Sequence, residues 1–269
     1  MLEDLRPTPG QHGQRRTYFA RWRGEQVVVK WGLDPDLPEK IPYVAGQIAE
    51  LRSRGIPAAP VLAHGTMPGG GYAWLQPRLP GRPARPTPGL LDEVLALLDR
   101  MRAAPAGPHR SDYNAWLTQV VRDDAAGYWA NAAALGADAR ALCARVRDSV
   151  DMSRTPAAAL DYVHIDLNLG NILTDGDTIV GLIDLENLGI GSGATDVACL
   201  AADWHRHGAP GLAEIVHYGR SRHGEEAWRW AVAHEMASRL GWRSEHFQAL
   251  DPAAEVAPAA AWFDAVYAD

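Results

Sequence analysis

The sequence predicts an α+β fold of two lobes, a small β-rich N-terminal lobe with one helix and a large, mainly helical C-terminal lobe. Three observations support this. Strand-like runs dominate the first 80 residues, a Pro- and Gly-rich stretch (LPGRPARPTPG) fills 79–89, and helical patterns dominate the rest. We therefore expect an N-terminal lobe at 1–78 and a C-terminal lobe at 79–269, joined as one unit.

The N-terminal elements follow from local patterns. Residues 17–31 carry two β-rich runs around an Arg-Gly turn, which is the pattern of a hairpin. Apolar residues at helical spacing predict a helix over 41–55, with a glycine as its stop. Prolines and a Gly triplet then delimit two short strands near 59–65 and 72–79.

The C-terminal lobe is predicted to consist of helices around one embedded hairpin. Thr87 can cap a helix that starts at Pro88, and 112–150 and 208–268 carry further helical patterns. Between them, 162–183 holds short apolar runs with an Asp-Gly turn, so we expect a hairpin inside the helical lobe.

Composition is that of an ordinary soluble globular protein, with 47% hydrophobic and 22% charged residues among 269. No apolar run is long enough to span a membrane, and the polar N-terminus lacks a signal-peptide pattern, so we expect a cytoplasmic protein without a membrane partner. Cys143 and Cys199 have no metal-type spacing and are expected to be buried free thiols.

Charge is unevenly distributed along the chain. The net charge of −7 argues against a nucleic-acid partner. Residues 1–80 carry ten Lys and Arg against seven Asp and Glu, whereas 81–269 carry sixteen against twenty-six. A basic N-terminal part suits an anionic ligand and an acidic remainder suits a cationic one, although solvated helix faces would give the same sums. Only Lys30 and Lys40 are lysines, so a lysine at the end of a strand indicates a specific need for an ammonium group.

The segment YVHIDLNLGNILTDGDTIVGLIDLENLG concentrates residues suited to phosphoryl transfer. His164 lies two residues before Asp166, Asn171 follows five residues later, and Asp184 ends an apolar strand thirteen residues further on. Phosphoryl transfer depends on positioning and charge neutralisation. A loop carboxylate can accept the hydroxyl hydrogen, and Asn and Asp supply the oxygen ligands that Mg²⁺ prefers. Each residue alone has an ordinary structural explanation, but the combined spacing favours chemistry.

This segment resembles the H-G-D-x-x-x-x-N … I-D-x-E signature of the aminoglycoside-phosphotransferase family, which also includes choline, homoserine, macrolide and tuberactinomycin kinases. The resemblance extends over roughly 10–205 and implies a bilobal, protein-kinase-like fold. The other matching stretches are VVVK at 27–30, GIPAAPVL at 55–62, RLPG at 78–81, GIG at 189–191 and DVA at 196–198.

By resemblance, Asp166 would be the catalytic base, His164 would orient the catalytic loop, and Asn171 and Asp184 would bind Mg²⁺. Glu186 fits the family's D-x-E, with a metal, substrate or structural role left open.

The nucleotide site is likewise implied by the resemblance. Lys30 would contact the α- and β-phosphates of ATP or GTP, and Gly10 and Gly13 lie in a candidate phosphate-covering turn. In the hinge, Pro77 lacks an N–H, so we expect its carbonyl to accept from adenine while the N–H of Leu79 donates.

The chain departs from the family pattern in four places. Ile165 replaces the glycine after the catalytic His, Asn168 replaces a His, and Leu169 replaces a Pro. The acid that should pair with Lys30 is also uncertain. The candidates on the predicted helix and just before it are Glu39, Glu50 and the non-acidic Gln47.

Other functions fit less well. A protein kinase is disfavoured, because only eleven residues separate Asp184 from Asp196 and leave no long activation segment. A non-catalytic nucleotide-binding protein is the alternative from another class, yet the catalytic positions are all present.

The acidic large lobe favours a cationic acceptor such as an aminoglycoside or tuberactinomycin-type antibiotic, inactivated as resistance. A metabolic kinase for choline, homoserine or a sugar is the alternative, and the oligomeric state, monomer or homodimer, stays open. The acidic residues expected to line the acceptor pocket are Asp112, Asp123, Asp124, Asp203 and Glu235, with Glu186 from the metal side.

Overall fold

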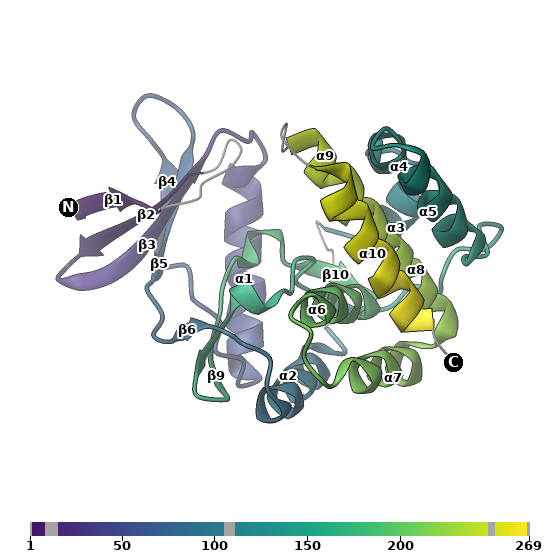
Figure 1. The fold of residues 1–269 in the computed structure, drawn as a ribbon. Helices are drawn as coiled ribbons and strands as arrows, with labels where there is room; N and C mark the ends of the chain where they lie inside the picture. Colours follow the sequence, from purple (N-terminus) through teal and green to yellow (C-terminus); the bar gives the residue numbers. More distant parts are fainter. Residues whose placement is uncertain (1, 9–15, 105–110, 247–250, 268–269) are drawn as a thin grey trace. The chain divides into compact units, whose positions relative to one another are not determined.

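The computed structural model describes residues 2–8, 16–104, 111–246 and 251–267, which form two units (Figure 1). The first unit combines Met1–Ala84 with Gly170–Leu188, and the second combines Arg85–Leu169 with Gly189–Asp269. The α+β, protein-kinase-like fold expected from the sequence is confirmed, with a β-rich N-terminal part that has one helix and a mainly helical C-terminal part.

The first unit is built on a five-stranded antiparallel sheet in the order β1-β2-β3-β5-β4. Its turn between β2 and β3 is tight because Arg23 and Gly24 both have positive φ, as a two-residue hairpin turn requires. The strands are β1 (Leu2–Pro7), β2 (Arg16–Trp22), β3 (Glu25–Gly32), β4 (Ala63–Thr66) and β5 (Tyr72–Pro77).

One helix, α1 (Leu37–Ser53), accompanies this sheet. It begins after Asp36, with a proline in its first turn, and ends just before Gly55, whose φ of 77° only glycine adopts easily. Its buried positions are Leu37, Ile41, Val44, Gln47, Ile48 and Leu51, all apolar except one amide.

A second, three-stranded sheet also belongs to the first unit, with β6 (Arg82–Pro83) pairing with β8 (Ile172–Asp175) and β8 with β9 (Thr178–Leu182). The N–H of Leu182 donates to the Pro57 carbonyl over 2.9 Å. Because of these backbone bonds the hairpin joins the first unit, whereas the sequence placed it in the helical lobe.

In the described part of the second unit, helices surround one pair of short strands, β7 (Asp161–Val163) and β10 (Gly189–Gly191). As expected, Thr87 caps α2, its hydroxyl accepting from the Leu90 N–H over 3.1 Å. The core is centred on Trp204, Trp228 and Trp230, which are fully buried. The helices are α2 (Pro88–Met101), α3 (Tyr113–Val121), α4 (Tyr128–Ala133), α5 (Ala137–Asp148), α6 (Ala194–Arg206), α7 (Leu212–His223), α8 (Glu225–Ala237), η3 (Ser238–Trp242, a π-helix), α9 (Arg243–His246) and α10 (Pro252–Tyr267).

Two composition-based expectations can be compared with the structure. Cys143 and Cys199 are buried and free. Among the described residues, no helix is long and apolar enough to cross a membrane.

Candidate active site

The hairpin of the first unit brings Asn171 and Asp184 to the same end. Ile172 lies opposite Leu182 in the β8–β9 register, and the Ile183 N–H donates to the Asn171 carbonyl over 3.0 Å. Asp184 then takes a left-handed conformation with φ 61°, and its side chain is 48% exposed. Left-handed non-glycine residues are costly and cluster at functional sites. The structure thus brings the backbone of two residues with oxygen-bearing side chains to the same end of the hairpin.

Lys30 makes two ion pairs with residues of this segment. Its Nζ lies 2.5 Å from Asp184 Oδ1 and 2.5 Å from Glu186 Oε2. Burial lowers the pKa of Lys30, but the charges of Glu186 and Asp184 outweigh it and raise the pKa above its ordinary value. The lysine therefore stays an ammonium despite being buried.

This pairing corrects the expected partners of Lys30. Glu39, Glu50 and Gln47 were the candidates on or near α1, but the ion pairs of Lys30 are with Asp184 and Glu186. Glu50 instead pairs with Arg54 one helical turn away, and Gln47 is a buried amide. Sequence spacing alone could not show a contact across more than 150 residues of chain.

A cavity of about 330 Å³ in the first unit leads to Lys30 and Asp184. Pro77 and Leu79 both line it. Arg78, between them, donates its N–H to the Gln26 carbonyl over 3.0 Å and so fixes the segment to β3. The other lining residues are Thr8, Thr17, Phe19, Val28, Ala59, Gln76, Gly81, Pro83, Leu173 and Ile183. Most of the lining residues are thus apolar, and a lysine and a carboxylate are among the polar ones, which suits a flat base joined to an anionic group.

The donor set fits Mg²⁺ when phosphate supplies further ligands. Asn171 and Asp184 offer an amide oxygen and a carboxylate, the hard ligands that this ion prefers. Within the part of the chain that the structure describes, no three His, Cys, Asp or Glu side chains gather to hold a metal by themselves. Mg²⁺ characteristically uses one or two protein ligands together with substrate phosphates.

The candidate catalytic loop, His164–Leu169, lies in the second unit and is held by a buried carboxylate. Asp196, on α6, accepts the backbone N–H groups of His164 and Ile165, each over 2.8 Å. Burial raises the pKa of Asp196 to about 6, although the backbone N–H groups and His164 oppose the shift. Ile165 has φ 69°, unusual for a β-branched residue, at the position where the resembling family has glycine. The two hydrogen bonds that the backbone N–H groups donate to Asp196 explain how this strained backbone is kept.

Asp166 itself is exposed, at the tip of this loop. Asn168 donates from its side chain to Asp166 Oδ1 over 2.7 Å, and the Leu169 N–H donates to the buried Asp203 over 2.8 Å. Asn168 and Leu169 are two of the positions where the sequence departs from the family pattern. Asn168 orients the Asp166 carboxylate through its side chain, and Leu169 is held through its backbone N–H. His164 is fully buried, as an orienting residue would be.

The acids expected to line an acceptor pocket are each engaged within their own unit. Asp112 caps α3, and Asp124 accepts the N–H groups of Trp129 and Ala130 at the start of α4. The remaining ones form ion pairs, Asp123 with Arg122, Asp203 with Arg206, Glu235 with Arg239 and Glu186 with Lys30. Gly10 and Gly13 lie outside the described residues.

Sequence reasoning missed the two carboxylates that hold the loop. Asp196 was recognised only as part of a matching stretch, and Asp203 was assigned to the acceptor pocket. Their spacing of seven residues on α6 was the available signal, because it places both on one face of a helix.

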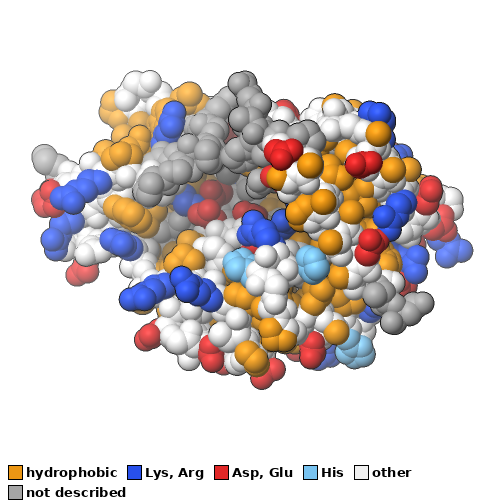
Figure 2. Space-filling model, in the orientation of Figure 1, with side chains coloured by type: hydrophobic (Ala, Val, Ile, Leu, Met, Phe, Trp, Pro, Cys, Tyr) orange, Lys and Arg blue, Asp and Glu red, His pale blue; other side chains and the backbone are white. Residues whose placement is uncertain are grey.

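Figure 2 shows acidic and basic side chains interspersed on the face that it draws, with no large area covered by acidic side chains alone. This face therefore has no continuous acidic field.

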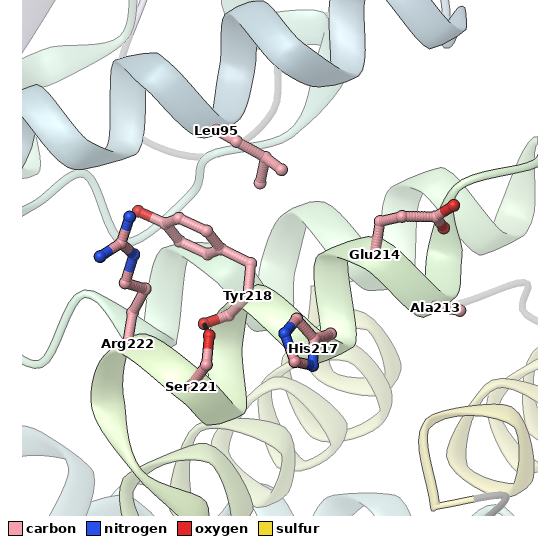
Figure 3. A pocket seen from close by; sticks show the side chains of 7 residues that line it. All are labelled: Leu95, Ala213, Glu214, His217, Tyr218, Ser221 and Arg222. Carbon is pink, nitrogen blue, oxygen red and sulfur yellow. Dashed lines mark hydrogen bonds between the residues drawn. The ribbon is translucent and has the colours of Figure 1, made fainter.

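A shallow hollow of about 600 Å³ lies on the surface of the second unit, where Leu95 of α2 faces residues of α7 (Figure 3). Tyr218 there donates to Asp99 over 2.9 Å, and Arg222 pairs with the same carboxylate. None of its lining residues belongs to the candidate chemistry.

A five-stranded antiparallel sheet with one helix, followed by a helical part, is the architecture of the kinase-like phosphotransferases. The chain belongs to the phosphotransferase enzyme family, whose model matches residues 4–234. It is a small-molecule kinase. No curated protein sequence matches it significantly.

Solved structures of aminoglycoside phosphotransferases share its fold. A thermostable mutant of APH(4)-Ia, in a ternary complex with AMP-PNP and hygromycin B, matches with a TM-score of 0.73 and 18% identity, over 100% of this chain and 96% of that one. APH(3'')-Id from Streptomyces rimosus matches with a TM-score of 0.59 and 16% identity, over 86% of this chain and 91% of that one. Aminoglycoside-3'-phosphotransferase of type VIII matches with a TM-score of 0.59 and 20% identity, over 86% of this chain and 93% of that one. At these identities the likeness concerns the fold.

Proposed function

We propose that this kinase is an ATP-dependent O-phosphotransferase that transfers the γ-phosphoryl group to a hydroxyl of a cationic small molecule, an aminoglycoside or tuberactinomycin-type antibiotic. The observation that carries the proposal is the pairing of Lys30 with Asp184 at the cavity of the first unit. It puts a cation for the phosphates beside a ligand for the metal. We expect the protein to act in the cytoplasm.

The nucleotide occupies the cavity of the first unit in this proposal. Adenine bonds to the Pro77 carbonyl and the Leu79 N–H, and both residues line the cavity. Lys30 binds the α- and β-phosphates. Related structures contain AMP-PNP or ADP, which supports a nucleotide site in this fold.

Asn171 and Asp184 would hold Mg²⁺, which neutralises charge on the phosphate oxygens when bound. The two residues lie at the same end of one hairpin, where the Ile183 N–H donates to the Asn171 carbonyl, so the backbone brings both potential ligands to one place.

Asp166 acts as the base. Its exposed carboxylate can reach a substrate hydroxyl and accept its hydrogen as the oxygen attacks phosphorus. The hydrogen bond from Asn168 orients this carboxylate through its Oδ1. The loop stays still during transfer because Asp196 and Asp203 hold its backbone from α6.

The acceptor class rests on the excess of acidic residues after residue 80 and on relatives solved with hygromycin B or streptomycin. One observation favours a second candidate, a neutral hydroxyl metabolite such as a sugar. The six acids proposed to bind ammonium groups already cap helices or pair with Arg and Lys.

A panel of acceptors tests this proposal. ATP consumption would be measured with aminoglycosides, tuberactinomycin-type peptides, choline, homoserine and sugars, at salt concentrations from about 0.1 to 0.5 M, where the Debye length falls below about 10 Å. A polycation bound by free acids should show a KM that rises steeply with salt while kcat changes little. Turnover of neutral acceptors alone, or a KM that ignores salt, would reject the cationic acceptor and select the second candidate.

A further inference from the structure

Both lysines of the chain bind the same short segment of the first unit. Lys30 pairs with Asp184 and Glu186, and Lys40 of α1 donates to Asn187 Oδ1 over 2.8 Å. Three of four consecutive residues, from the candidate metal ligand onward, are therefore bound by an ammonium group. In a chain with 26 basic residues, only two of them lysines, this coincidence indicates a dedicated arrangement.

The two carboxylates around Lys30 differ in exposure. The Asp184 side chain is 48% exposed, whereas that of Glu186 is 12% exposed and that of Lys30 is 7% exposed. The attraction between two opposite charges is stronger when they are shielded from water. Removing one partner of such a pair leaves the other charge buried and uncompensated. Glu186 is thus the better anchor, and Asp184 is the partner free to exchange.

Among the described residues, the ion pairs of Lys30 are with Asp184 and Glu186 and not with an acid of α1. The buried positions of α1 are apolar except for Gln47, whose amide is 8% exposed and whose Nε2 lies 3.4 Å from the Tyr43 hydroxyl. Glu50 is occupied by Arg54.

We propose that Glu186 is the positioning residue that holds Lys30 for the nucleotide phosphates, so that Lys30 stays in place when Asp184 binds the metal. This inference rests on the proposed roles of Lys30 and Asp184. Its consequence is that the acid holding Lys30 comes from the segment just after β9, two residues beyond the candidate metal ligand, and not from α1. Lys40 supports the same segment from the helix through Asn187.

Kinetics provide the first test. The near-isosteric variant Glu186→Gln keeps the shape and removes the charge, and we expect kcat/KM for ATP to fall by about 10- to 100-fold, as for other residues that orient a ligand-binding group. Glu186→Asp should retain part of the activity. Glu50→Gln, which removes a charge on α1 that is paired with arginine, serves as the matched control and should match the wild type. Equal activity of Glu186→Gln and the control would overturn the proposal.

The second test does not depend on turnover. With only two lysines, protein labelled with ¹³C-lysine gives two side-chain ε-CH₂ signals, assigned with Lys40→Arg. A clamped Lys30 should show two inequivalent ε protons, both alone and with Mg²⁺ and AMP-PNP. In Glu186→Gln they should merge once Mg²⁺ and AMP-PNP are added. If that variant does not fold, the wild type carries the test, and loss of inequivalence on adding Mg²⁺ and AMP-PNP would overturn the inference.

The two failures can be told apart. If Lys30 responds to the nucleotide identically in Glu186→Gln and the wild type, the positioning role is wrong and the kinase assignment stands. If the wild-type Lys30 signal does not respond to Mg²⁺ and AMP-PNP at all, the proposed role of Lys30 in binding phosphate is wrong, and the positioning role is overturned with it.

Discussion

The two halves of the candidate machinery are held in different ways. In the first unit, Lys30 meets Asp184 and Glu186 through side-chain charges, and one of these carboxylates is half exposed. In the second unit, the buried carboxylates of Asp196 and Asp203 accept hydrogen bonds from backbone N–H groups of the candidate catalytic loop. Side-chain ion pairs can exchange partners when a ligand arrives, whereas buried backbone bonds cannot be given up without a large cost. The half proposed to bind the nucleotide is therefore suited to rearrange when a ligand binds, and the half proposed to carry the base is suited to stay fixed.

The largest effect on turnover should come from the first unit, whose side-chain ion pairs can exchange partners. Asp184→Ala removes the carboxylate proposed for the metal and should lower kcat by about 10³-fold or more, and Asn171→Ala should cost less because it removes a neutral ligand. The measurement is Mg²⁺-dependent ATP turnover. Asp175→Ala, an exposed change at the turn of the same hairpin, is the control. Full activity in excess EDTA would contradict the metal assignment.

The fixed half should respond to Asp196→Asn. An amide has only one acceptor oxygen for the two N–H groups of His164 and Ile165, so one buried donor loses its partner. We expect kcat to fall by about 5- to 150-fold, the equivalent of the roughly 1–3 kcal/mol that such a donor costs, with nucleotide affinity unchanged. Steady-state kinetics would measure kcat, and nucleotide titration would measure the affinity. An equal loss in kcat and in nucleotide affinity would contradict the assignment of these roles to separate units.

The same residue gives a pH prediction. The pKa of Asp196 is about 6 in the folded protein, above the ordinary value of 3.8, because burial disfavours its charged form. Its contribution to stability is therefore fully present below pH 4 and is lost as the pH rises through 6, by roughly 3 kcal/mol. Urea unfolding should show that the stability of the wild type relative to Asp196→Asn decreases by this amount between pH 4 and 7. A difference independent of pH would contradict the raised pKa.

The smallest effect should come from Ile165→Gly. The left-handed backbone at Ile165 costs an isoleucine about 1–2 kcal/mol, which glycine avoids, while glycine adds about 0.5–1 kcal/mol of unfolded-state entropy. Loss of the half-buried side chain further offsets the gain, so the free energy of unfolding should change by less than about 1 kcal/mol. Ile190→Gly, at a buried position of β10 with ordinary backbone, should cost several-fold more. Equal losses in the two variants would contradict the strain at Ile165.

Local signals predicted much of this molecule. The hairpin around β2 and β3, the cap at Thr87 and the adjacency of Asn171 and Asp184 all follow from patterns within a few residues. The ion-pair partners of Lys30 could not be predicted from such local patterns, because they lie more than 150 residues away and reach Lys30 only in the folded chain. Asp112 could have been recognised as a helix cap rather than a substrate ligand, since Asp is favoured just before a helix.

The most direct test of the account compares binding and turnover in Asp166→Asn. The account assigns the nucleotide to the first unit and the base to the second, so this variant should bind ATP as the wild type does while kcat falls at least about 10²-fold. Asp148→Asn, an exposed change at the end of α5, controls for surface charge. The binding constant would be taken from calorimetry with AMP-PNP and kcat from ATP consumption with the best acceptor. Near-wild-type turnover in Asp166→Asn would remove that residue from the mechanism and contradict the account.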